Sequence, residues 1–169
     1  RHLDTLGVKI SHIPVSQEGL IQLDVLDKLL VEKPDLVSVM YVNNETGVIQ
    51  PLDDVIQRSR VHNVLIHTDC VQAWGKMQLS IRGLDPDFAT FSGHKVGGPK
   101  GIGLLYIRED AQFVPLIWGG GQERRLRAGT ENVPGILALG AAVQHLEKGS
   151  YSEIYKLREV LKDCQSHQL

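Results

Sequence analysis

One stretch restricts the possible folds more than any other, the run Leu-Val-Ser-Val-Met-Tyr-Val at residues 36–42. A nearly continuous apolar run of this length is typical of a strand buried on both faces of a parallel sheet. Shorter apolar runs recur at residues 64–68, 88–91 and 102–107. Strands that alternate with helices predict an α/β fold with a mostly parallel sheet and flanking helices.

The helices are predicted from apolar residues spaced for one face. The first is expected to be capped by Asp24 and to end before Pro34, and the second to run from Asp53 or Asp54 to about Val61. The third is expected to be capped by Asn132, to hold Pro134 in its first turn and to reach about Lys148. A last helix is expected over residues 152–164. The alternation in Val8–Val15 predicts one further strand.

Composition narrows the class of protein. The 169 residues are 42% apolar and 22% charged, which suits one globular domain with a real core. A net charge of −2 argues against a nucleic-acid surface, which needs a basic excess. No apolar run approaches the roughly 20 residues that cross a bilayer. Cys70 and Cys164 fit no metal-ligand spacing, so no metal is expected, and the default setting is reduced and cytoplasmic.

The two ends of the sequence are informative. The chain starts Arg-His-Leu-Asp, without an initiator methionine, and ends just after an amphipathic run. We therefore expect that it is a part of a larger protein.

Polar residues follow several of the predicted strands. Asn43 and Asn44 follow the first apolar run, Asp69 follows the second, and the glycine-rich segment 92–101, Ser-Gly-His-Lys-Val-Gly-Gly-Pro-Lys-Gly, follows the third. Ligands of parallel α/β sheets bind at the carboxyl ends of the strands, where all of these residues would meet. The amine of Lys95 can condense with an aldehyde, and Ser92 and His94 can hold an anion. Taken alone, this segment is more often a surface turn with a solvated lysine, and it is the convergence of polar groups that favours a site.

Five motifs, in order, resemble those of the cysteine desulfurases, which belong to the class-V aminotransferase group of pyridoxal-phosphate enzymes. They are Asn-Asn-Glu-Thr-Gly at 43–47, His-Thr-Asp-Cys-Val-Gln-Ala at 67–73, Ser-Gly-His-Lys at 92–95, Gly-Gly-Gly-Gln-Glu-Arg at 119–124 and Arg-Ala-Gly-Thr at 127–130. Asn44, Gln72 and Lys95 lie 28 and then 23 residues apart, as in the family. The resemblance covers residues 8–148. It implies the fold-type I large domain, with residues 1–148 its central cofactor-binding part and 149–169 a helix leading toward a small C-terminal domain.

The resemblance also implies roles. Lys95 would bind the cofactor aldehyde and act as the catalytic residue, and Asp69 would pair with the pyridine nitrogen. Gln72 and Asn44 would hydrogen-bond the phenolic oxygen, and Ser92 and His94 would hold the phosphate. Thr130 would reach the phosphate of a neighbouring subunit, which implies a homodimer. His67 is expected to pack within a strand.

Some of the family's machinery has no counterpart in these residues. The resemblance places the persulfide-forming cysteine and the substrate-binding arginine after Leu169, and a phosphate-binding helix, a ring-stacking histidine and one strand before Arg1. Cys70 stands at a position that is usually small and is expected to be a small buried hydrophobe. The 169 residues alone are therefore expected to be inactive.

The implied reaction of the intact protein is conversion of L-cysteine to L-alanine, with sulfur kept as a persulfide for a sulfur-acceptor protein that serves iron-sulfur cluster assembly or other delivery. Selenocysteine lyase is the nearest alternative. A non-catalytic remnant that acts as a structural or partner-binding module is another, although all of the motif residues are present. A nucleotide-binding α/β domain is a third, but the sequence lacks a phosphate-binding G-x-x-x-x-G-K-[ST] motif.

Overall fold

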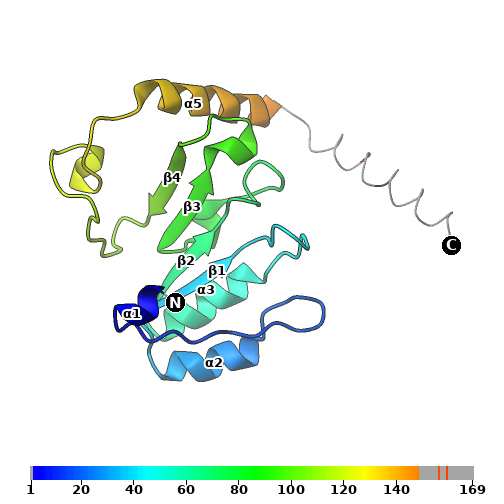
Figure 1. Ribbon diagram of the computed structural model, residues 1–169. Helices are drawn as coiled ribbons and strands as arrows, with labels where there is room; N and C mark the ends of the chain where they lie inside the picture. The colour runs from blue at the N-terminus through cyan, green and yellow to red at the C-terminus, as the bar shows by residue number, and fades with distance from the viewer. Residues whose placement is uncertain (1, 149–155, 157–158, 160–169) are drawn as a thin grey trace. The chain divides into compact units, whose positions relative to one another are not determined.

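The computed structural model describes residues 2–148, 156 and 159. It contains a four-stranded sheet in the order β1-β2-β3-β4, with β1 Leu36–Met40, β2 Leu65–Asp69, β3 Phe88–Ser92 and β4 Gly103–Ile107 (Figure 1). Strands β1, β2 and β3 are parallel. The backbone N–H of Arg108, just after β4, donates to the carbonyl of Asp87, just before β3, so β4 runs antiparallel to β3. The predicted mostly parallel α/β fold is confirmed.

The helices are α1 His2–Thr5, α2 Leu23–Val31, α3 Leu52–Val61, α4 Ile81–Leu84 and α5 Val133–Lys148, with short 3-10 helices η1 Gly93–Val96 and η2 Glu123–Arg125. Within the part of the chain that is described, no helix has the length and apolar character needed to cross a membrane. The predicted helix over residues 152–164 and Cys164 lie outside the described residues.

The chain divides into two compact units. The first consists of residues up to Gln72 together with Ser80–Thr90 and Leu105–Gln112, and the second of Ala73–Leu79, Phe91–Leu104 and the described residues from Phe113 onward. This division cuts across β3 and β4, which the sequence did not indicate.

The core of the first unit lies between the sheet and two helices. Leu26 and Leu30 of α2 and Val55 of α3 are completely buried, and they pack in one cluster with Val37 of β1 and Ile66 of β2. The side chains of β1 alternate between exposed and buried. Because successive strand residues point to opposite faces, only one face of β1 is covered, whereas the sequence predicted a strand buried on both faces.

Two helix starts differ from the prediction. Helix α2 begins at Leu23 with Gln22 as its N-cap, and α3 begins at Leu52 with Pro51 as its N-cap, so Asp24, Asp53 and Asp54 lie in the first turns. Acidic groups are favourable there because they face the positive end of the helix dipole. The Asn132 cap of α5 is confirmed, since its Oδ1 accepts the N–H of Gly135 at 3.1 Å.

The predicted strand Val8–Val15 is wrong. Only Val15 makes a bridge, an antiparallel one with Ile21, and residues 8–14 form no regular structure. An extended segment becomes a strand only when a neighbour takes its backbone hydrogen bonds along its length. The backbone hydrogen bonds found for this segment among the described residues are local ones, from Val8 N–H to the carbonyl of Leu3 and from Gln22 N–H to the carbonyl of Pro14. Side-chain contacts also tie it to the rest of the unit: Ile13 packs against the core, and Lys9 forms an exposed ion pair with Glu32, with 2.8 Å between Nζ and Oε2.

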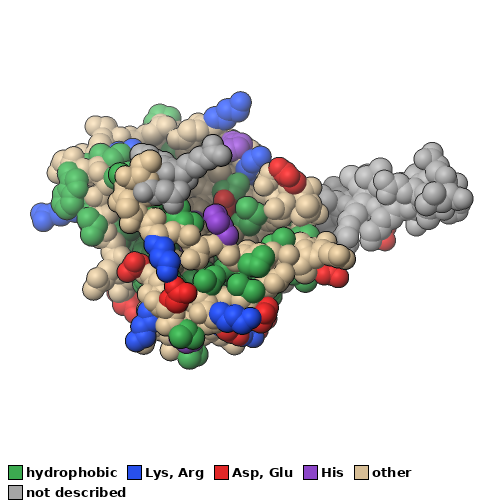
Figure 2. Space-filling view, turned by 60° about the horizontal axis from the view of Figure 1, so that its bottom comes forward, with side chains coloured by type: hydrophobic (Ala, Val, Ile, Leu, Met, Phe, Trp, Pro, Cys, Tyr) green, Lys and Arg blue, Asp and Glu red, His purple; other side chains and the backbone are tan. Residues whose placement is uncertain are grey.

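Charged side chains of both signs are interspersed on the face shown in Figure 2, which fits the small net charge.

Candidate active site

Three of the predicted site residues belong to the first unit: Asn44, Asp69 and Gln72. Asp69 is the last residue of β2, and its Oδ1 accepts the backbone N–H of Val71 at 2.8 Å. The exit of β1 lies beside it, because Tyr41 N–H donates to the carbonyl of Asp69 at 2.9 Å. The loop that carries Asn44 therefore starts next to the strand end that carries Asp69, and Gln72 follows in the turn after β2.

The two asparagines of the loop after β1 have different hydrogen-bond partners. Oδ1 of Asn43 accepts the backbone N–H groups of Glu45 and Thr46, both at 2.9 Å, so this side chain holds the turn. The neighbouring Asn44 is exposed, and none of the hydrogen bonds found among the described residues uses its side chain. Asn44 is thus the asparagine whose side chain is not used by the turn, and its role toward a ligand stays a prediction.

The other four predicted residues, Ser92, His94, Lys95 and Thr130, belong to the second unit. Ser92 ends β3, and its Oγ lies 2.8 Å from Nδ1 of His94. His94 and Lys95 are exposed on η1, a 3-10 helix where the sequence indicated a loop. Thr130 is exposed shortly before α5, and the structure shows no contact that ties it to the other three.

Glycines allow η1 to pack closely. A Cβ on Gly93 would lie 2.7 Å from Cγ2 of Ile102, and one on Gly98 would lie 2.9 Å from the carbonyl oxygen of Gly93. Leu139 of α5 is buried against both glycines. The backbone under Lys95 is therefore fixed, while the lysine itself faces solvent.

A second amine lies close to Lys95. Burial lowers the pKa of Lys76, and the nearby Lys95 ammonium lowers it further. This neighbour was not predicted, because the two lysines are 19 residues apart and no local pattern links them.

Cys70 is a buried hydrophobe, as predicted. Its side chain is completely buried, and burial raises the pKa of its thiol to about 11, with a smaller contribution from the charge of Asp69. The thiol therefore stays protonated and unreactive near neutral pH.

The prediction for His67 was incomplete. Its Nδ1 lies 2.8 Å from Oγ of Ser38 on β1, and its Nε2 lies 3.2 Å from Oγ1 of Thr90 on β3. The available sequence signal was a polar residue in each of three adjacent predicted strands, at positions that share one face once the register is known.

Each unit carries groups that suit pyridoxal phosphate. A hydroxyl, an imidazole and an amine gather within four residues on a rigid turn, which suits an anion beside an aldehyde, and an anchored carboxylate stands at a strand end, which suits a protonated ring nitrogen. The fold is α/β, and the Ser92–His94–Lys95 turn is a candidate site for a phosphorylated aldehyde.

Comparison with known proteins identifies the family. The profile of the Aminotransferase class-V family matches residues 1–169, and the chain belongs to this family. It is 44% identical over 158 residues to "Cysteine desulfurase IscS" of Rickettsia africae, covering 92% of this chain and 38% of that protein. The chain therefore spans about two fifths of the length of the curated relatives it matches.

Solved structures agree with this assignment. A "NIFS-LIKE PROTEIN" matches with a TM-score of 0.90 and 42% identity, over 98% of this chain and 47% of that one. "SspA in complex with cysteine" matches with a TM-score of 0.80 and 38% identity, over 85% of this chain and 42% of that one.

Proposed function

We propose that the protein that carries this chain is a pyridoxal-phosphate-dependent cysteine desulfurase. The observation that carries the proposal is the Ser92–His94–Lys95 turn, in which an exposed amine stands beside a hydrogen-bonded hydroxyl and imidazole on a backbone fixed by glycines. The family uses pyridoxal phosphate, and the curated relative described above is named as a cysteine desulfurase.

Bound pyridoxal phosphate would supply an electron-withdrawing ring that makes the α-proton of an amino acid acidic. Lys95 would hold the cofactor through its Nζ and then take that α-proton. Ser92 Oγ and His94 would hold the phosphate, and Asp69 would keep the ring nitrogen protonated. Asn44 and Gln72 would donate hydrogen bonds to the phenolic oxygen.

The substrate would be L-cysteine. Its C–S bond would break, its sulfur would form an S–S bond with a cysteine thiolate of the enzyme, and protonation of the remaining carbon would give L-alanine. Cys70 does not suit the role of that thiolate, because it is buried and its pKa is raised to about 11. The family resemblance places the nucleophile outside these residues, so the 169-residue chain alone should not turn over cysteine.

Two partners belong to the same proposal. Thr130 would act at the phosphate site of a second copy, which makes the enzyme a homodimer with shared sites. A sulfur-acceptor protein would take the persulfide sulfur for iron-sulfur cluster assembly or other delivery. The compartment would be the cytoplasm.

The test of the lysine uses the protein encoded by the open reading frame that contains these residues. After incubation with pyridoxal phosphate, borohydride reduction and peptide mapping should find the label on Lys95. Lys95→Ala should lose the label and all turnover, while the matched Lys100→Ala should keep both. A label on Lys76 or Lys100 in the wild-type protein would contradict the assignment.

The test of the reaction supplies L-cysteine with a reductant and measures sulfide together with alanine. Equal amounts of both over many turnovers are expected. Turnover of L-selenocysteine with none of L-cysteine would identify a selenocysteine lyase instead, and absence of any cofactor label would point to a non-catalytic module.

A further inference from the structure

A hydrogen-bonded row of polar side chains crosses three strands of the first unit. Ser38 Oγ lies 2.8 Å from Nδ1 of His67, and Nε2 of the same ring lies 3.2 Å from Oγ1 of Thr90. Ser38 belongs to the uncovered face of β1, opposite the buried Val37 and Val39. The row therefore lies on the open face of the sheet and not in the α2–α3 core.

The two hydroxyls of this row satisfy the hydrogen-bonding capacity of a neutral His67 imidazole. A neutral ring has one nitrogen that donates and one that accepts, and each hydroxyl can take either part, so both tautomers are fully bonded. Burial lowers the pKa of His67, while the charge of Asp69 opposes that shift. Strands β1 and β3 offer the ring only hydroxyls, and Asp69 is the one charged group found to act on it within the described residues.

Asp69 stands directly beyond this row. It lies two residues after His67 on β2, so both side chains share a face, and Thr90 is its register partner on β3. In the proposed function, the negative charge of Asp69 pairs with the protonated ring nitrogen of the cofactor. A positive charge on His67 would compete for the same carboxylate and repel the same ring.

We propose that His67 is a positioning residue for Asp69: the Ser38–His67–Thr90 row keeps an uncharged imidazole beside the carboxylate, which leaves the carboxylate's charge to the ring nitrogen of the cofactor. This inference rests on the proposed function. It assigns His67 no contact with substrate or cofactor, and its effect passes through Asp69.

Two variants hold the charge at position 67 constant, whereas the wild-type imidazole changes its charge with pH. His67→Gln is uncharged at every pH, and its amide can take the place of Nε2 toward Thr90. His67→Lys carries a cation at neutral pH. If the charge is what matters, the first should behave like the neutral wild-type protein and the second like the protonated one.

The probe is pyridoxamine 5′-phosphate, which needs no covalent bond to Lys95, and its control is the 1-deaza analogue, which lacks the ring nitrogen. Dissociation constants are measured between pH 5 and pH 8 in the protein encoded by the open reading frame that contains these residues. Wild type and His67→Gln should bind the probe equally at pH 8. At pH 5 the wild type should bind about fivefold more weakly than His67→Gln, a coupling of ordinary size. His67→Lys should be weak throughout.

The deaza analogue should show no difference between wild type and His67→Gln at any pH. A matched signature comes from the imidazole NMR resonances of the cofactor-free protein: Asp69→Asn should lower the pKa of His67, because it removes the charge that raises it. This measurement does not depend on whether His67→Lys folds.

Parallel pH profiles for wild type and His67→Gln down to a pH at which the NMR titration shows His67 protonated, with the probe still preferred over its deaza analogue, would overturn the role of His67 and leave the proposed function standing. The same wild-type weakening with the deaza analogue would also overturn it, because the effect would then not pass through the ring nitrogen. Equal binding of probe and deaza analogue by the wild type at pH 8 would remove the role of Asp69 and the inference with it.

Discussion

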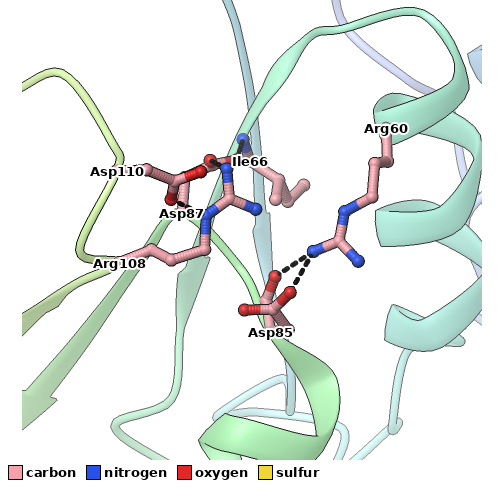
Figure 3. Close-up of polar contacts among 6 residues, drawn as sticks. All are labelled: Arg60, Ile66, Asp85, Asp87, Arg108 and Asp110. Carbon is pink, nitrogen blue, oxygen red and sulfur yellow. Dashed lines mark hydrogen bonds and ion pairs between the residues drawn. The ribbon is translucent and has the colours of Figure 1, made fainter.

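Asp87 is the residue whose replacement should damage the fold most clearly. It lies just before β3 with an exposed side-chain fraction of only 6%, and its two carboxylate oxygens have different partners (Figure 3). Oδ2 accepts the buried backbone N–H of Ile66 at 2.7 Å, and Oδ1 pairs with the Arg108 guanidinium at 2.7 Å. Asp87 thereby joins the start of β3 to β2 and to the residue after β4.

The cost of Asp87→Ala can be estimated from these contacts. A buried N–H left without an acceptor costs about 1–3 kcal/mol. Loss of the ion pair adds less than a fully buried pair would, because Arg108 is partly exposed and keeps Asp110, whose Oδ1 lies 2.6 Å from its Nε. The free energy of unfolding should therefore fall by about 3 kcal/mol.

Urea unfolding followed by circular dichroism measures this loss. Asp87→Asn should lose less, because its amide oxygen can still accept the Ile66 N–H. The matched control is Asp110→Ala, which removes the other, exposed partner of Arg108 and should leave the urea midpoint nearly unchanged, because solvent screens an exposed ion pair. If Asp87→Ala were no more destabilising than Asp110→Ala, the assignment of Asp87 as the link between these strands would be refuted.

Three further predictions concern a thiol, a strained turn and a glycine. The free energy of unfolding should fall by up to about 3 kcal/mol between pH 9 and pH 11. The reason is that folding raises the pKa of Cys70 from 9.0 to about 11, so only the unfolded thiol ionises in that window. In Cys70→Ala, the urea midpoint should no longer fall over this pH range. Arg124 has φ 58°, so Arg124→Gly should stabilise the protein by roughly 0.5 kcal/mol, whereas Arg82→Gly in α4 should destabilise it by about 1 kcal/mol in the same thermal-melting assay. Gly93→Ala should cost about 1–3 kcal/mol in urea unfolding, because its Cβ would lie 2.7 Å from Ile102, and an unchanged midpoint would show that η1 can shift to make room.

The sequence predicted the strands and helices that have strong periodic signals. The four strands β1 to β4, the three longer helices α2, α3 and α5, and the Asn132 cap all follow from apolar spacing and cap chemistry. It failed at Val8–Val15, because alternation gives a segment the capacity to form a strand but not a neighbour to pair with. It also missed η1, since a helix of only four residues is too short to carry a periodic signal.

The candidate site was predictable only as a set of positions. Motif order and strand ends indicated Asp69, Ser92, His94 and Lys95. Which of Asn43 and Asn44 holds the turn depends on which side-chain amide oxygen accepts the backbone N–H groups of the turn, and this needs the structure. The Ser38–His67–Thr90 row depends on the register of three strands, and the proximity of Lys76 and Lys95 depends on tertiary packing. None of these has a local signature in the chain.

The packing around η1 also predicts which residues would change first if selection for catalysis were lost and only selection for folding remained. Gly93 and Gly98 are locked by contacts that any side chain would violate, so purifying selection for folding alone would retain them. His94 and Lys95 are exposed, and folding places little demand on them. Under the proposed function, the glycines should therefore outlast the lysine in descendants that had lost catalysis, and an intact Lys95, more than intact glycines at 93 and 98, would separate a working copy from a pseudoenzyme.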